Sequence, residues 1–167
     1  MRVRRGTVIG LLCVITALLQ TSFVNYIQIA SIRPNLPVIL TASFALMCGR
    51  RQGMTIGFFT GILVDVFSGG TLGFYALAYM WTGYLTGYAY RIFYDDDIKT
   101  PLLLIAVSDL GYGFYQYVTT FLIRGRIHFL FYLRRIIIPE LIYTVIVAAF
   151  LYQLFYMINK HTTRGYF

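Results

Sequence analysis

The sequence has little charge. Only 12% of its 167 residues are Asp, Glu, Lys or Arg, whereas a soluble domain carries about a quarter. The uncharged residues form long apolar runs, and no stretch between these runs is long enough to bury a core of its own. The sequence therefore excludes a soluble domain, and we expect a single membrane domain over residues 1–167.

Residues that carry metal, redox or catalytic chemistry are also scarce. Cys13 and Cys48 lie inside apolar runs, and His128 and His161 are isolated. Asp95–Asp97 predicts a solvated loop, because three adjacent carboxylates point in different directions and form no metal cage unaided. The chain has no H-E-x-x-H, G-x-S-x-G or P-loop motif. We expect no enzyme, no metal and no cofactor.

Positive charge exceeds negative charge, with 14 Lys and Arg against 6 Asp and Glu. In a soluble protein this excess of +8 would suggest nucleic acid. Here most arginines stand at the ends of apolar runs, where positive charge sets membrane topology and meets anionic lipid headgroups. The charge therefore predicts membrane lipids as partners, and no nucleic acid.

The apolar runs predict an all-α polytopic membrane protein. A helix needs about 20 residues to cross the hydrocarbon core. We expect about six transmembrane helices, which cover residues 7–29, 34–49, 53–70, 72–94, 100–123 and 136–158. The first is too long for a signal-peptide core and no small-residue cleavage site follows it, so we expect it to stay uncleaved.

The last span has two interpretations. Either its helix opens at Pro139 and residues 124–138 lie along the membrane interface, or it begins near Phe129 and is kinked at Pro139. Arg134 and Arg135 favour the first interpretation, because two adjacent arginines deep in lipid are costly.

Lys and Arg are unevenly divided between the two sides of the expected membrane. One side receives nine of them, Arg2, Arg4, Arg5, Arg50, Arg51, Arg91, Lys99, Lys160 and Arg164, and the other receives five, Arg33, Arg124, Arg126, Arg134 and Arg135. The positive-inside rule therefore predicts that both termini are cytoplasmic. A five-span arrangement would leave the C-terminus outside.

A four-residue spacing, of glycine at every position but one, runs through the third span and past both of its ends. The series is Gly49, Gly53, Gly57, Gly61, Asp65, Gly69 and Gly73, and Gly83 and Gly87 repeat the spacing on the next span. Glycines four apart let another helix backbone approach closely, although the row drifts by about 40° per step. We favour packing within the bundle, and a docking face for a partner helix is compatible with it.

Ionisable residues inside the spans are candidates for function. They are Asp65, Asp109 and Glu140, with Arg134 and Arg135 at about the level of Glu140. We expect Asp65 or Glu140 to pair with one of the two arginines in a structural ion pair. A proton or substrate site is the alternative.

Several segments together resemble the MreD family. They are Arg33-Pro34-Asn35-Leu36-Pro37, Gly49-Arg50-Arg51-Gln52-Gly53, Gly57-x3-Gly61-Ile62-Leu63-Val64-Asp65 and Leu72-Gly73-x2-Ala76-Leu77, with Arg135-x3-Pro139 before the last span. The resemblance covers nearly the whole chain, and residues 33–90 are its diagnostic part. The Asp95–Asp97 loop does not match the family pattern.

The resemblance implies a non-enzymatic subunit of the bacterial cell-elongation (rod) complex in the inner membrane. The implied partners are MreC, MreB, RodA and a class B penicillin-binding transpeptidase, with which the subunit supports peptidoglycan synthesis and cell shape. The MreC transmembrane helix is expected to dock on Gly53, Gly57 and Gly61, with Asp65 ordering the outer end of that surface.

The MreD family is also similar in fold to the substrate-binding subunits of energy-coupling-factor vitamin transporters. This likeness implies an alternative function, a substrate-binding membrane subunit of a small-molecule transporter. Asn25, Asp65, Asp109 and Gln116 would then contact the ligand in a pocket that opens to the outside.

Overall fold

The computed structural model describes residues 2–23, 26, 32–89, 98–125 and 128–163. Within these ranges the regular elements are helices, as the sequence predicts. The expected Asp95–Asp97 loop and Asn25 lie outside the described residues.

In chain order the elements are α1 (Arg2–Leu18), the π-helical turn η1 (Leu19–Phe23), α3 (Leu36–Cys48), α4 (Arg50–Ser68), α5 (Phe74–Ala89), α6 (Lys99–Tyr117), the π-turn η2 (Val118–Leu122), α7 (Phe129–Tyr132), the π-turn η3 (Leu133–Ile137) and α8 (Ile138–Thr163).

The last helix corrects one interpretation of the sequence. Its helix does not open at Pro139, because helical structure continues through α7, η3 and α8 from Phe129 to Thr163. The N–H of Ile138 donates to the carbonyl of Leu133, five residues earlier. A proline removes one N–H and its ring crowds the carbonyl four residues before it. The wider π-turn directly before Pro139 accommodates both effects, so arginines 134 and 135 lie within a long helix.

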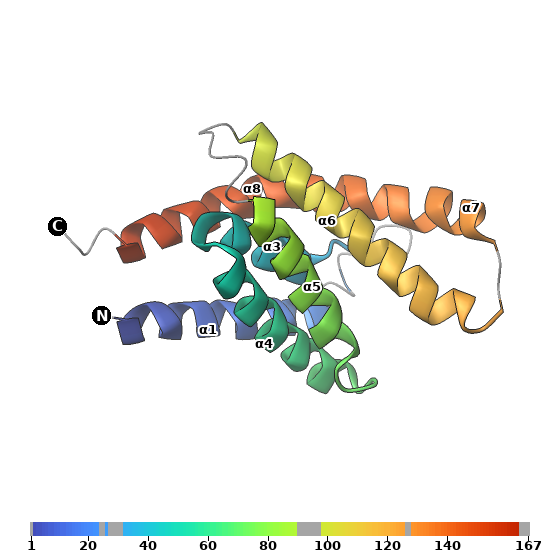
Figure 1. The fold of residues 1–167 in the computed structure, drawn as a ribbon, viewed down its shortest axis with the longest axis horizontal. Coiled ribbons are helices and arrows are strands. Elements are labelled where there is room, and N and C mark those ends of the chain that lie inside the picture. Colours follow the sequence, from blue (N-terminus) through green and yellow to red (C-terminus); the bar gives the residue numbers. More distant parts are fainter. Residues whose placement is uncertain (1, 24–25, 27–31, 90–97, 126–127, 164–167) are drawn as a thin grey trace.

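Helix α3 is the centre of the molecule. It contacts α1, α4, α5, α6 and α8, and every residue from Pro37 to Ala45 is buried. A helix that is apolar on all sides is removed from water either by other helices or by lipid, and here the neighbouring helices bury it. The other helices therefore pack around α3, and the hairpin of α4 and α5 crosses it on one side (Figure 1).

Hydrogen bonds between distant segments define two ends of the bundle. At the first, which we call the Arg5 end, Arg5 Nη2 lies 2.9 Å from Cys48 Sγ and 3.2 Å from Asn159 Oδ1. The start of α1 and the end of α8 therefore lie at the same end of the molecule, as Figure 1 shows. At the opposite end, which we call the Arg33 end, the backbone N–H of Leu36 donates to Gln20 Oε1 at 3.1 Å.

Large apolar side chains cover the outside of the bundle. Exposed examples lie on α1, α4, α5, α6 and α8, and include Leu11, Phe59, Trp81, Leu103 and Phe150. A surface of this kind is unusual in water and suits lipid. By length and composition, two of the described helices, Arg5–Phe23 and Phe129–His161, are apolar enough to cross a membrane, and α3 is apolar but shorter.

Candidate functional site

The expected glycine surface of α4 is filled by α5 of the same chain. A Cβ added to Gly57 would meet the backbone of Tyr79, and a Cβ added to Gly61 would meet the backbone of Ala76. The nearest atoms would lie closer than 3.0 Å, and they are backbone atoms that cannot rotate away. Glycine at these positions is therefore required by the close approach of the two helices.

The contact is reciprocal, because glycines of α5 face α4. A Cβ on Gly83 would meet the backbone of Gly53, and a Cβ on Gly87 would meet the backbone of Arg50. Gly53 also faces Ala45 of α3. The two glycine rows thus interlock within the chain, and they leave no room for a partner helix on this face of α4.

Gly69 and Gly73 do not belong to this packing surface. A Cβ added to either residue would have nothing within 4 Å. Both have positive φ angles, 65° and 95°, in the turn that joins α4 to α5. This left-handed conformation favours glycine, so the two residues form the turn that folds α5 back onto α4.

Asp65 holds the beginning of α5. It is 1% exposed, and its carboxylate oxygens accept hydrogen bonds from the backbone N–H groups of Gly73 at 2.9 Å, Tyr75 at 3.0 Å and Ala76 at 3.2 Å. The first N–H groups of a helix have no partner within it, and a carboxylate there also interacts favourably with the helix dipole. Asp65 therefore acts as a cap for α5, and not as the expected partner of an arginine.

The two candidate arginines of the last helix face outward. Arg134 and Arg135 are exposed, and the guanidinium of Arg135 lies over the ring of Phe131, 5.5 Å from its centroid. Glu140, one turn further along, is half-buried and lines a polar cavity. The two arginines and the Glu140 carboxylate therefore lie on different faces of this helix.

Asp109 lies inside the bundle on α6. It is 4% exposed, and its Oδ1 atom has no hydrogen-bond partner among the described residues. Among the described residues, no three His, Cys, Asp or Glu side chains lie close enough together to hold a metal ion.

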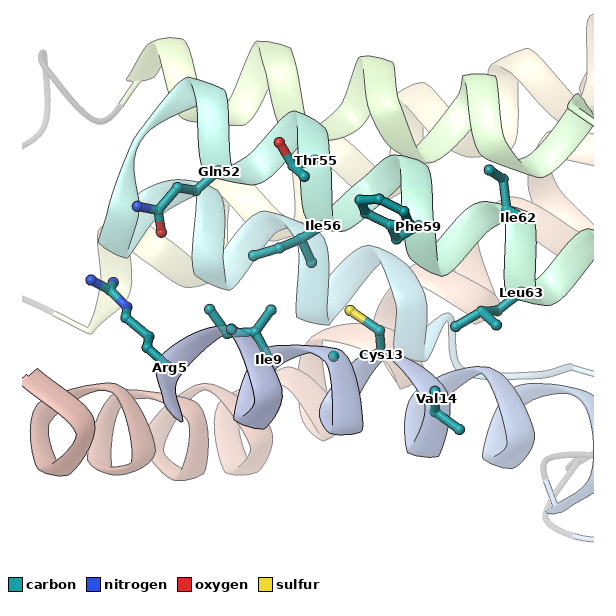
Figure 2. Close-up of a pocket in the computed structure, with 12 residues that line it drawn as sticks. Arg5, Ile9, Cys13, Val14, Gln52, Thr55, Ile56, Phe59, Ile62 and Leu63 are labelled. Carbon is teal, nitrogen blue, oxygen red and sulfur yellow. The ribbon is translucent and has the colours of Figure 1, made fainter. Parts of the chain in front are cut away.

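An apolar groove of about 1000 Å³ lies between α1 and α4. We call it the α1–α4 groove. Figure 2 shows Ile9 and Cys13 of α1 facing Ile56 and Phe59 of α4. The Arg5 and Gln52 side chains stand together at one end of the groove, which is the Arg5 end of the bundle, and Leu63 lies toward the other.

Two open glycines, four residues apart on α1, lie in this groove. Gly6 and Gly10 line it, both are exposed, and a Cβ added to either would have nothing within 4 Å. Their spacing is the same four residues that marks α4, and it was visible in the sequence. Two glycines are a weaker signal than a series of six glycines and an aspartate, so this pair was not predicted as a packing surface.

A second cavity of about 540 Å³ opens at the Arg33 end. We call it the Arg33 cavity. The first and last helices, the segment before α3, and α4, α5 and α6 all contribute to it. It brings Gln116 and Glu140 together with Arg33 and with tyrosines that sequence reasoning did not single out, such as Tyr112 and Tyr132. Asp109 is not part of its lining.

Comparison with known proteins identifies the family. The family model described as rod shape-determining protein MreD matches residues 1–161, a range that includes both cavities and almost all of α8. Comparisons with curated proteins and with solved structures find no match, so the similarity to vitamin-transporter subunits stays a prediction. The chain belongs to the MreD family of rod shape-determining proteins, which are inner-membrane proteins.

Proposed function

We propose that this chain is a non-enzymatic subunit of the bacterial cell-elongation complex that holds the transmembrane helix of MreC in the α1–α4 groove. The family match supports membership of this complex, and the groove supports the proposed mode of binding MreC. By holding MreC, the subunit supports or regulates peptidoglycan synthesis by RodA and a class B penicillin-binding transpeptidase along MreB filaments.

The unfilled glycine pair is the observation that carries the proposal. In lipid, helices associate through close packing of small residues, because apolar burial gives little net driving force there. The glycines of α4 and α5 have already found their partners within the chain, whereas Gly6 and Gly10 have none. A partner helix that packs its own small residues on this pair would approach the α1 backbone in the same way.

The Arg5 end of the groove offers a polar anchor. Arg5 already donates to Cys48 and Asn159 through Nη2, and its Nε atom is buried without a hydrogen-bond partner among the described residues. A buried unpaired donor is costly. The guanidinium carries further N–H donors, and Arg5 lines the groove. A carbonyl or carboxylate near the end of the MreC helix would accept from this guanidinium and would fix the depth of that helix in the membrane.

The proposed arrangement has six spans with both ends of the chain in the cytoplasm. The start of α1 and the end of α8 meet at the Arg5 end. Arg50 and Arg51 begin α4 there as well, since Arg5 contacts Cys48, two residues before Arg50. This concentration of basic residues supports a cytoplasmic Arg5 end under the positive-inside rule.

Filling the groove tests the proposal. Gly6→Leu and Gly10→Leu place a large side chain in open space, so we expect each variant to fold and to lose co-purification of MreC. Gly111→Leu is the matched control, because Gly111 is also exposed on a helix with nothing within 4 Å of an added Cβ. Normal recovery of MreC with both groove variants would reject this docking site, provided that gel filtration shows intact protein.

The transporter alternative is less well supported. The family match is to MreD, and it does not favour a vitamin-binding subunit. Recovery of ATPase and transmembrane coupling subunits in the same co-purification, in place of MreC, would favour that alternative.

A further inference from the structure

The Arg33 cavity has a polar lining although it lies within an apolar bundle. Of its fourteen lining residues, only Val64, Phe67 and Ile136 lack a polar side-chain group. Polar side chains are rare inside membrane proteins unless they contact each other, water or a ligand. A volume of about 540 Å³ lies in the range of small-molecule sites. The cavity is therefore large and polar enough to hold more than a few water molecules.

Its buried wall is already fixed by hydrogen bonds. The Asn35 backbone N–H donates to Thr144 Oγ1 at 3.2 Å, and Asn35 Oδ1 accepts from the hydroxyl of Tyr79 at 3.3 Å. The hydroxyls of Tyr79 and Tyr112 lie 3.5 Å apart. The Tyr79 hydroxyl is thus within donating distance of both Asn35 Oδ1 and the Tyr112 oxygen. A phenolic oxygen has two lone pairs, so the Tyr112 oxygen keeps at least one of them as an acceptor for a group in the cavity.

The aromatic rings of this wall also favour positive charge. Tyr75 stacks on Tyr79 with ring centroids 6.1 Å apart, and Tyr79 stacks on Tyr112 at 5.2 Å. Tyr132 lines the cavity from the last helix. Tyrosine rings and phenolic oxygens attract ammonium groups. Glu140, on the same helix as Tyr132, adds a half-buried carboxylate to this acceptor side.

The opposite charge stands at the rim. Arg33 is exposed and lines the cavity just before α3. A guanidinium carries five N–H donors and suits carboxylate or phosphate oxygens. A simple cation would be repelled by Arg33, and a simple anion would be repelled by Glu140, so the two charges together select a ligand that carries both signs.

We propose that the Arg33 cavity binds a zwitterionic group, with its ammonium at Glu140 and the tyrosine wall and its phosphate or carboxylate at Arg33. Two sources share this chemistry, an ethanolamine-type phospholipid headgroup and a free zwitterion of similar size. None of the residues that line the Arg33 cavity lines the α1–α4 groove, so the inference stands or falls independently of the docking of MreC.

The test uses the full chain in nanodiscs of phosphatidylglycerol, a lipid without an ammonium group. O-phosphoethanolamine is titrated into the sample, and binding is measured by calorimetry and by the shift of the thermal unfolding midpoint. In a second arm, nanodiscs with a mixture of phosphatidylethanolamine and phosphatidylglycerol are examined by native mass spectrometry for the lipid that the protein retains.

We expect saturable binding of O-phosphoethanolamine, selective retention of phosphatidylethanolamine, or both, and the arm that responds identifies the source. Arg33→Gln and Glu140→Gln are expected to weaken binding about tenfold or more, since each removes one charge-assisted contact. Arg134→Gln is the matched control, because Arg134 is exposed on the same helix as Glu140 and does not line the cavity. If Glu140→Gln fails to fold, the exposed Arg33→Gln decides.

Three results would overturn the proposal. One is the absence of binding in both arms. The second is binding by the two variants that equals that of wild type. The third is equally tight binding of inorganic phosphate or of ethanolamine alone, which would show a site for a single charge.

Discussion

The carbonyl oxygen of Gly53 on α4 lies too close to leave room for a Cβ on Gly83 of α5, and the carbonyl oxygen of Gly83 lies 2.8 Å from where a Cβ on Gly53 would stand. The two glycines therefore mark a backbone-to-backbone contact. The four-residue glycine spacing of α4 therefore serves packing within the bundle. The proposed partner site lies instead on α1, at Gly6 and Gly10.

A first prediction concerns the stability of the α4–α5 hairpin. Gly57→Ala should destabilise the bundle by about 1–3 kcal/mol, because the added methyl group meets the backbone of Tyr79. Gly111→Ala should be neutral or stabilising by up to about 1 kcal/mol, since alanine favours a helix where space is open. Thermal unfolding in a mild detergent compares the two variants, and equal midpoints would contradict the packing account.

The cap on α5 gives a second prediction. Asp65→Ala leaves three backbone N–H groups of Gly73, Tyr75 and Ala76 without their acceptor, so it should cost about 2 kcal/mol or more. Asp65→Asn keeps one side-chain carbonyl oxygen and should lose less. The order of unfolding midpoints, wild type above Asn above Ala, is the measurement. A midpoint for Asp65→Ala equal to that of wild type would show that these hydrogen bonds contribute nothing to stability.

The direction of insertion gives a third prediction. In a background with Cys13 and Cys48 replaced by alanine, Leu72→Cys lies in the exposed turn between α4 and α5, and Gln52→Cys lies near the Arg5 end. A membrane-impermeant maleimide added to spheroplasts should label Leu72→Cys and should label Gln52→Cys only after lysis. The reverse pattern would place the Arg5 end outside.

The sequence predicted an all-helical fold, because long apolar runs favour helices, and the described residues confirm this fold class. It did not predict what covers each face. The four-residue spacing of Gly53, Gly57 and Gly61 shows that a backbone approaches, but the same spacing serves a neighbouring helix or a partner. In the structure, the approaching backbone is that of Tyr79 and Ala76 on α5 of the same chain.

Two further differences have local causes. Pro139 predicted the start of a helix, and the π-turn η3 instead lets the helix continue past it. Asp65 suggested an ion pair because charges in lipid usually need opposite charges. Its partners are backbone N–H groups eight to eleven residues later. Because every residue except proline has a backbone N–H, the residue types do not reveal such partners.

The docking of MreC in the α1–α4 groove is tested most directly by photo-crosslinking in living cells. A photoreactive phenylalanine analogue is placed at Val14 or Phe59, which line the groove, and at Trp81 or Leu103 as exposed controls on other helices. We expect adducts with MreC from Val14 and Phe59 and none from the two controls. Adducts from Trp81 or Leu103, with none from the groove positions, would contradict it and place MreC on another face of the bundle.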